Sequence, residues 1–314
     1  MIARQPRRRD ALRWLAAVPA LFGLPVHAAQ VRFEPVADGV HAFIGETGAR
    51  TVGNEGLNAN FGAVVTGEGV LLIDSGATWE GARQIHEAIR RITPQPVRWV
   101  INTGGQDHRW LGNGYFREQG AELIAHAAAE SDMRLRGGDQ LEALRALLGP
   151  RAARTEPVLP TRWISGTDTR LRLGRVDLVL RHAGGAHTPG DMLVWLPAQR
   201  VLFSGDVVYV DRLLGVLPVS RTRQWLDTLT ALEGLQPERI VPGHGRVCTL
   251  AQAQAQTRDY LAALRAHMKR AVDEGTDLSA AVKSFDAAPW AGLLNAAELM
   301  PGNASRVYLE LERE

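Results

Sequence analysis

Five side chains of the kind that bind metal ions lie along the chain, each in a short turn that contains glycine. They are Asp107, His108, His187, Asp206 and His244. Zinc in proteins takes imidazole nitrogens and carboxylate oxygens as ligands, and a hydrolytic zinc site keeps one position for water. Zinc lowers the pKa of such a water to about 7, which provides hydroxide near neutral pH. The residue types therefore predict a metal site for hydrolysis, provided that the fold brings the turns together.

The turns follow apolar runs, as the ends of strands would. Their sequences are NTGGQDHRW at 102–110, GGAHTPGD at 184–191, FSGD at 203–206 and PGHG at 242–245. The apolar runs at 97–101, 201–203 and 239–241 are typical of buried strands. Taken singly, an aspartate here can cap a helix and a histidine can be a hydrogen-bonded core residue. Four glycine-bearing turns that coincide with strand ends favour one shared site instead.

The elements that must position these turns alternate between strands and helices. Strand-like segments are predicted at 31–35, 40–44, 61–66, 70–74, 97–101, 161–165, 169–173, 176–182 and 192–196. Helices are predicted at 79–92, 110–119, 221–233 and 250–274, mostly helix at 121–149, and a strand or short helix at 307–311. Two similar halves, each a small sheet with helices on one side, would pack as an α/β four-layer αββα sandwich.

One polar segment, residues 45–60, separates two predicted strands and carries four glycines. Loops of this length in a compact domain are usually functional or disordered. Two interpretations remain open, a mobile flap beside the site and a plain surface loop.

The N-terminal residues 1–28 have the pattern of an export signal. Arginines precede an uncharged run at 14–26, and a small-residue cleavage motif ends at Ala28. The adjacent arginines resemble a twin-arginine signal. The uncharged run is too short to span a bilayer. We therefore expect a periplasmic or secreted protein with one domain at 29–314 and no stable membrane anchor after cleavage.

Charge and cysteine content exclude several classes of function. Five of the 36 basic and one of the 34 acidic side chains lie in residues 1–28, which leaves 31 basic against 33 acidic ones. This near balance does not favour nucleic acid as a partner, and a small-molecule substrate is expected. Cys248 is the only cysteine, so neither an intrachain disulfide nor a cysteine metal cluster can form.

The succession of DH, G-x-HTPGD, FSGD and PGHG resembles the metallo-β-lactamase superfamily, from about residue 40 to about residue 268. The resemblance implies the αββα sandwich, with metals at one edge between its halves. It assigns Asp107, His108 and His244 to the second metal and Asp206 to a bridging position. It also implies that Asp74 braces the metal loop without binding the ion.

The first metal site departs from this pattern. The family signature is His-x-His-x-Asp-His, and its two leading histidines fall on Thr103 and Gly105, so only His187 remains of that site. The departure disfavours a dinuclear centre of the glyoxalase II kind and the iron-dependent persulfide dioxygenase branch. The mononuclear lactamase branch works with the second site alone, although it has a cysteine where this chain has Asp206.

The resulting hypothesis is an exported hydrolase of a thioester, ester or amide that uses one zinc ion, with Asp107, Asp206 and His187 as catalytic residues. Asp206 would bind the ion or accept a proton from water, and His187 would be a hydrogen-bond donor to substrate or a weak extra ligand. Iron or manganese would also accept this ligand set. The segments 53–62 and 102–116 also resemble exported metallohydrolases associated with quinoprotein and sulfur-oxidation systems. The alternative is a non-catalytic zinc-binding accessory protein that retains the fold.

Overall fold

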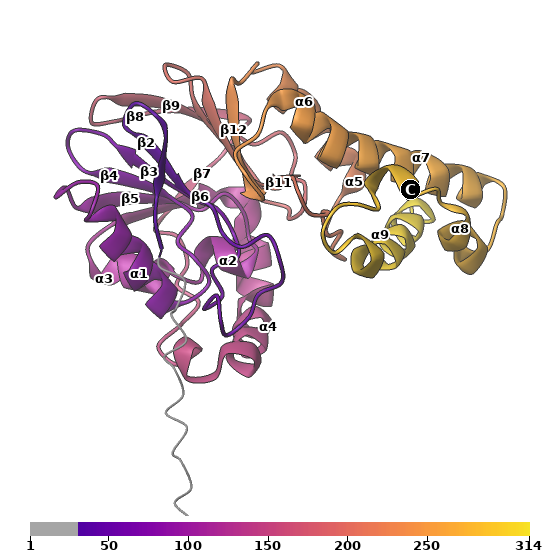
Figure 1. Ribbon diagram of the computed structural model, residues 1–314, viewed down its shortest axis with the longest axis horizontal. Coiled ribbons are helices and arrows are strands. Elements are labelled where there is room, and N and C mark those ends of the chain that lie inside the picture. Colours follow the sequence, from indigo (N-terminus) through magenta and orange to yellow (C-terminus); the bar gives the residue numbers. More distant parts are fainter. Residues whose placement is uncertain (1–30) are drawn as a thin grey trace, which may run out of the picture.

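The protein is described by a computed structural model over residues 31–314. The predicted export signal at residues 1–28 lies outside the described part of the chain. Two β-sheets face each other, and helices cover the outer face of each sheet (Figure 1). The predicted α/β sandwich of four layers, αββα, is therefore confirmed. No helix among the described residues has the length and hydropathy needed to cross a membrane.

The first sheet contains seven strands in chain order. They are β1 (Glu34–Ala37), β2 (Val40–Phe43), β3 (Phe61–Val65), β4 (Val70–Ile73), β5 (Val97–Ile101), β6 (Glu122–His126) and β7 (Arg162–Ile164). The first four pair antiparallel, whereas β4 to β7 pair parallel. Parallel pairing places the carboxyl ends of β4 and β5 at the same edge, and the turn that carries Asp107 follows β5 there.

The second sheet contains five strands in the order β12-β11-β10-β9-β8. They are β8 (Asp168–Leu173), β9 (Val176–Arg181), β10 (Leu193–Leu196), β11 (Val201–Tyr209) and β12 (Arg239–His244). β11 and β12 are parallel, and the other neighbours are antiparallel. The inner faces of both sheets share one apolar core, to which Leu71 and Ile101 contribute from the first sheet and Val194 and Phe203 from the second.

Amphipathic helices form the two outer layers. Against the first sheet lie α1 (Trp79–Ile89), α2 (Asp107–Trp110), α3 (Asn113–Glu118) and α4 (Glu130–Leu148), with 3₁₀ turns at Ala127–Ala129 and Gly149–Ala152. Helix α1 begins where predicted, because the side chain of Thr78 accepts a hydrogen bond from the N–H of Gly81. It buries Ile85 and Ile89 against the sheet, as the helical spacing predicts.

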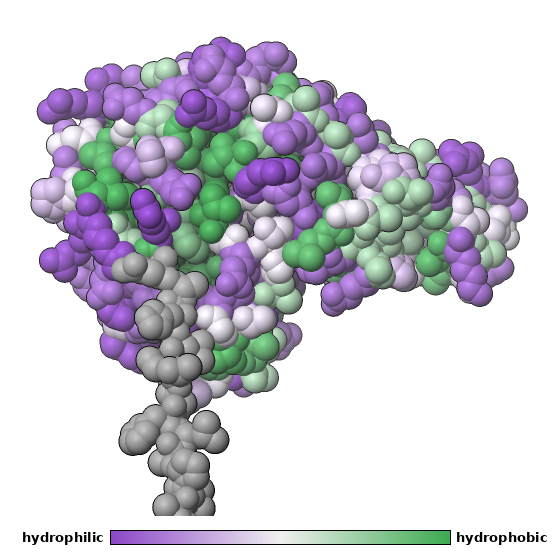
Figure 2. All heavy atoms as spheres, in the orientation of Figure 1, coloured by the Kyte–Doolittle hydropathy of each residue, from purple (hydrophilic) through white to green (hydrophobic). Residues whose placement is uncertain are grey.

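The second outer layer is formed by the C-terminal helices, which extend beyond the sheets (Figure 1). They are α5 (Thr222–Glu233), α6 (Leu250–Ala253), α7 (Asp259–Asp273), α8 (Leu278–Ser284) and α9 (Ala296–Leu311), with a π turn at Gln254–Arg258 and a 3₁₀ turn at Ala288–Trp290. The tail at 307–311 is thus the end of a helix. On the face shown in Figure 2, hydrophobic residues gather between hydrophilic rims over the sheets and along these helices.

The expectation of mostly helix at 121–149 is wrong for its first part, because β6 occupies Glu122–His126. Leu123, Ile124 and Ala125 are fully buried. A strand between two parallel neighbours is covered on both faces, so it lacks the alternation that identifies a strand, and its alanine-rich composition favours helix. Tertiary pairing with β5 and β7 decides the structure here.

Candidate metal centre

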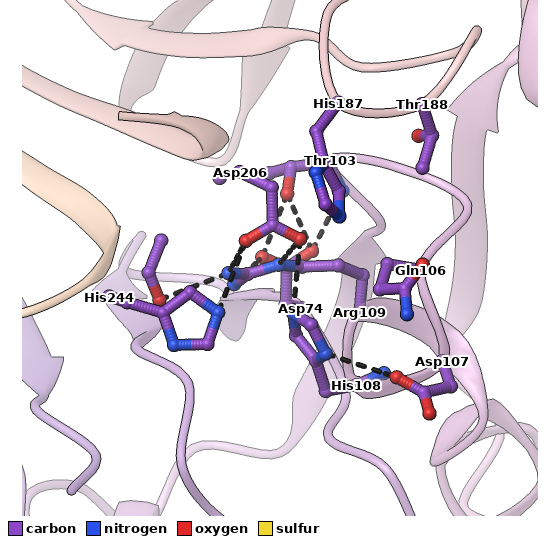
Figure 3. Close-up of polar contacts among 12 residues, drawn as sticks. Asp74, Thr103, Gln106, Asp107, His108, Arg109, His187, Thr188, Asp206 and His244 are labelled. Atoms are coloured by element: carbon purple, nitrogen blue, oxygen red, sulfur yellow. Dashed lines mark hydrogen bonds and ion pairs between the residues drawn. The ribbon is translucent and has the colours of Figure 1, made fainter. Parts of the chain in front are cut away.

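Three of the predicted ligands meet at one edge of the sandwich (Figure 3). His108 lies on α2 directly after β5, Asp206 lies in β11, and His244 is the last residue of β12. One ligand atom from each residue lies within 4.8 Å of the other two, and all three side chains are buried. The junction of the two sheets therefore collects ligands that are far apart in the chain.

The position of Asp206 differs from the expected one, because it lies inside a strand and not in a turn after it. Gly205 has φ +50°, and the pairing of β11 with β12 shifts register beside it. Glycine takes this left-handed conformation without steric cost. The strand is therefore distorted at residue 205 without ending there, and the carboxylate of Asp206 lies near His108 and His244.

The hydrogen bonds of His244 leave a ligand atom directed at Asp206. Its Nδ1 lies 2.9 Å from the carbonyl oxygen of Asn58, which can only accept, so Nδ1 carries the proton. Burial lowers the pKa of His244 to about 3, so the ring is neutral at pH 7. The unprotonated Nε2 then faces Asp206 Oδ1 at 3.4 Å. Two acceptors in this arrangement are placed to bind one cation together.

His108 completes the set. Its Nε2 lies 3.0 Å from Asp206 Oδ2, and its Nδ1 lies 3.0 Å from Asp107 Oδ1. A metal-binding histidine usually donates its other ring N–H to a carboxylate or carbonyl, and Asp107 is placed to accept that proton. Tetrahedral zinc ligands at roughly 2.0–2.1 Å from the ion lie about 3.3 Å apart. The Nε2 atoms of His108 and His244 lie 3.0 and 3.4 Å from oxygens of Asp206, which fits the spacing of ligands around one ion.

Two predicted ligands lie outside this group of three. The carboxylate of Asp107 contacts Arg50 and the Nδ1 side of His108, away from Asp206. His187 donates from Nδ1 to the carbonyl of Gly215 at 2.9 Å, and burial lowers its pKa to about 4. Its Nε2 is therefore unprotonated at pH 7. This tautomer favours a weak ligand or a proton acceptor over the predicted hydrogen-bond donor.

Arg109 is the largest charged group beneath the site. Its side chain is 1% exposed, and its guanidinium contacts both oxygens of Asp206 at 2.6 and 3.2 Å and Asp74 Oδ2 at 2.9 Å. Burial alone would raise the pKa of Asp206, but Arg109 and His108 hold it well below its ordinary value. Asp206 is thus ionised and remains available to a metal ion.

Asp74 occupies the bracing position that the resemblance implies. It accepts hydrogen bonds from the N–H of Thr103 at 2.7 Å and from the Thr103 hydroxyl at 2.8 Å. The hydroxyl of Thr103 is therefore engaged in a hydrogen bond to Asp74. A Cβ added to Gly105 would lie 2.5 Å from Asp132 Oδ2, which Arg136 holds by two hydrogen bonds. The two positions that lack histidine are filled by other contacts.

The segment at 45–60 folds onto the site, which confirms its predicted position, whereas its mobility stays a prediction. Arg50 Nη1 and Nη2 contact the carboxylate of Asp107 at 2.5 and 2.8 Å, and Nη2 lies 3.1 Å from His108 Nδ1. Burial alone would raise the pKa of Asp107, but Arg50 and His108 hold it well below its usual range. The sequence analysis missed Arg50, and no motif marks it.

Asn60 fixes the base of this segment to the strand that carries His244. Its amide donates to the carbonyls of Pro242 at 2.8 Å and Gly245 at 2.7 Å, and its Oδ1 accepts from the N–H of Gly45 at 3.0 Å. We expect Asn60→Ala to lower the free energy of unfolding by about 3 kcal/mol, because it leaves these buried groups unpaired.

Urea unfolding of the metal-free protein measures this loss. Asn58→Ala is the matched control, because the side chain of Asn58 makes one hydrogen bond, to the carbonyl of Gly48 at 3.2 Å. Its loss should stay below about 1 kcal/mol. Equal losses in the two variants would contradict the role assigned to Asn60.

Comparisons with known proteins agree with the fold described above. The model of the metallo-beta-lactamase superfamily matches residues 54–244. The chain is 26% identical over 198 residues to "Metallo-beta-lactamase IND-1" from Chryseobacterium indologenes, covering 61% of this chain and 74% of that protein. It is 28% identical over 180 residues to "Acyl-coenzyme A thioesterase MBLAC2" from Homo sapiens, covering 52% of this chain and 61% of that one.

Solved structures share the fold. A metallo-beta-lactamase from Pontibacter korlensis superposes with a TM-score of 0.60 at 20% identity, over 74% of this chain and 99% of that one. At this level of identity the likeness concerns the architecture only.

Proposed function

Because the chain belongs to the metallo-β-lactamase superfamily, whose members are metal-dependent hydrolases, we propose that it hydrolyses an acyl bond of a thioester, ester or amide with one zinc ion. His108, Asp206 and His244 would hold the ion. The observation that carries this proposal is the convergence of imidazole nitrogens on Asp206, with the Nδ1 of each ring facing an acceptor at 2.9 or 3.0 Å. Two histidines and one carboxylate leave a position open, as catalytic zinc sites do.

A zinc ion bound here supplies Lewis acidity, which activates water near neutral pH and polarises an acyl carbonyl. The chain itself contributes orientation and proton transfer. Asp107 orients His108 through Nδ1. The unprotonated Nε2 of His187 has no hydrogen-bond partner among the described residues, so it is available to accept a proton from a water or a leaving group. Asp107 and His187 therefore act around the ion, and Asp206 binds it.

The names of two relatives support an acyl bond as the substrate. One is named a lactamase and another an acyl-coenzyme A thioesterase, and the bonds they break share a carbonyl carbon as the point of attack.

Export stays part of the proposal, with the signal at 1–28 removed and the mature protein in the periplasm or secreted. The mass of the purified protein shows whether residues 1–28 have been removed. A purified protein that retains them would contradict export with cleavage.

Steady-state hydrolysis of a panel of acyl substrates by zinc-loaded mature protein tests the activity. We expect turnover of at least one thioester, ester or amide, and loss of that turnover in His244→Ala. A chromogenic β-lactam belongs in the panel because lactamases are among the relatives. Turnover that persists in His244→Ala at full activity would contradict a role for this centre.

The contacts of Arg50 and Arg109 with two of the site carboxylates also suit a second candidate, a non-catalytic zinc-binding accessory protein. Such contacts stabilise the site without substrate. The same panel separates the two candidates. Bound zinc with no turnover on any substrate favours the accessory protein, and zinc-dependent turnover favours the enzyme.

A further inference from the structure

Two guanidinium groups lie against the carboxylates of the centre, one from below and one from the segment at 45–60. Arg109 spans both oxygens of Asp206, with Nη2 at 2.6 Å and Nε at 3.2 Å. Arg50 spans both oxygens of Asp107, at 2.5 and 2.8 Å. Each carboxylate therefore already has a resident cation in the geometry of a two-pronged ion pair.

The place of Arg109 is built to hold a cation. Its Nη1 and Nη2 donate to the carbonyls of Asn60 and Gly243, each at 3.0 Å. A Cβ on Gly243 would lie 2.6 Å from both Arg109 Nη2 and Asp206 Oδ1. Only glycine at 243 lets the guanidinium reach the carboxylate. Together with the contacts to Asp206 and Asp74, these bonds satisfy all five N–H directions that an arginine offers.

Arg50 is held differently. Its side chain is 17% exposed, and its Nε is buried without a hydrogen-bond partner among the described residues. In the described part of the chain, the polar contacts of its guanidinium are with Asp107 and His108. The carboxylate of Asp107 is therefore the main polar group that holds this cation at the centre.

The charges of the buried groups fit one divalent ion. Asp74, Asp107 and Asp206 bring three negative charges, and Arg50 and Arg109 bring two positive ones. One divalent ion leaves a net charge of one positive unit, which a bound hydroxide neutralises. Two divalent ions would leave three positive charges in a buried site, or two with a bound hydroxide, which is strongly unfavourable.

We propose that Arg109 takes on Asp206 the place that the missing first metal cation holds in a two-ion centre, and that Arg50 holds the carboxylate of Asp107 away from the remaining ion. The loss of the histidine positions at 103 and 105 is thereby matched by the internal cation of Arg109, and the centre binds one divalent ion. The inference rests on the single-ion centre of the proposed function. It is tested by zinc binding alone, so a failure to find a substrate does not affect it.

Zinc titration by calorimetry, with the ion count from native mass spectrometry, tests the part played by Arg50. Wild type is expected to bind one ion. Arg50→Gln frees Asp107 and removes a like charge, so we expect zinc to bind about tenfold tighter. Arg50→Lys keeps the charge and should stay within about threefold of wild type.

Weaker zinc binding in Arg50→Gln than in wild type would overturn this role. If Arg50 merely props Asp107 so that it orients His108, Arg50→Gln should weaken zinc binding by about 10- to 100-fold. A wild-type protein that binds two ions with similar affinity would also overturn it, together with the single-ion part of the proposed function. Hydrolysis is measured separately on the same samples.

Arg109→Met and Arg109→Lys test the buried cation through thermal unfolding with and without zinc. In Arg109→Met the ion must replace a missing charge on Asp206, so zinc should raise Tm by at least about 5 °C more than in wild type. Arg109→Lys should return the shift toward the wild-type value. An equal zinc shift in wild type and Arg109→Met would overturn the proposal, and so would an Arg109→Met protein that does not fold even with zinc.

Discussion

Asp206→Asn is expected to abolish tight zinc binding and to lower zinc-dependent hydrolysis by at least about a thousandfold, because an ion's contribution of several kcal/mol to the barrier is lost with it. Asp206 is the only carboxylate among the three clustered ligands. Asparagine offers one oxygen and an NH₂ group, and that group would face the donors of Arg109. The guanidinium would keep only Asp74 as a charged partner.

The same variant is expected to lower the free energy of unfolding by about 3–5 kcal/mol, the usual cost of removing one partner of a buried ion pair. Elemental analysis, urea unfolding and kinetics measure the three effects. Asp191→Asn is the matched control. Asp191 is buried, and burial raises its pKa to about 8, so asparagine resembles its protonated form at pH 7. Wild-type zinc affinity in Asp206→Asn would contradict the assignment of the ligands.

The strands that carry the ligands could be predicted because their apolar runs are short and bounded by glycine. Val97–Ile101 was predicted with the bounds that the structure has, and the predicted runs at 201–203 and 239–241 are the first third of β11 and the first half of β12. Their continuation through Gly205 and Gly243 was not predicted. Glycine usually ends a strand pattern, whereas here Gly205 bends β11 and Gly243 makes room for Arg109.

Residue type was sufficient to find the ligands but not their partners. Four glycine-bearing turns coincide with predicted strand ends, so His108, Asp206 and His244 could be proposed from the chain alone, together with Asp107 and His187. Arg50 lies far in sequence from Asp107, and its contact depends on how a polar segment folds back. Arg109 follows a predicted ligand directly, but sequence spacing does not tell whether its side chain turns to solvent or beneath the site.

The gap in the family signature has a physical counterpart that the sequence alone did not reveal. Without histidines at 103 and 105, only His187 remains of the first metal site. In the structure Thr103 is bonded to Asp74, and the space at Gly105 is taken by Asp132. The first metal site is therefore replaced by other polar contacts, and adding histidine at 105 would require Asp132 to move.

Trp225→Ala is expected to cause the largest loss of stability among single core substitutions near the site, about 3–5 kcal/mol. Trp225 lies on α5, is fully buried, and donates from Nε1 to the carbonyl of Val207 at 2.9 Å. Its ring packs edge-on against His187, with ring centroids 5.7 Å apart. It also contacts Tyr209, which stacks on His244 at 5.0 Å.

Trp225 packs against the imidazole of His187, and Tyr209 packs against that of His244. The loss of the Trp225 ring should therefore also change zinc binding. We expect Trp225→Ala to weaken zinc binding by about tenfold, the lower end of what loss of an orienting group costs. Trp290→Ala is the matched control, because Trp290 also donates from Nε1 to a carbonyl, that of Ala255 at 2.9 Å, but its ring packs against Phe285 and Tyr260. It should lose stability and keep wild-type zinc affinity. If Trp225→Ala is destabilised yet binds zinc like wild type, the ring of Trp225 stabilises the fold without positioning the ligands.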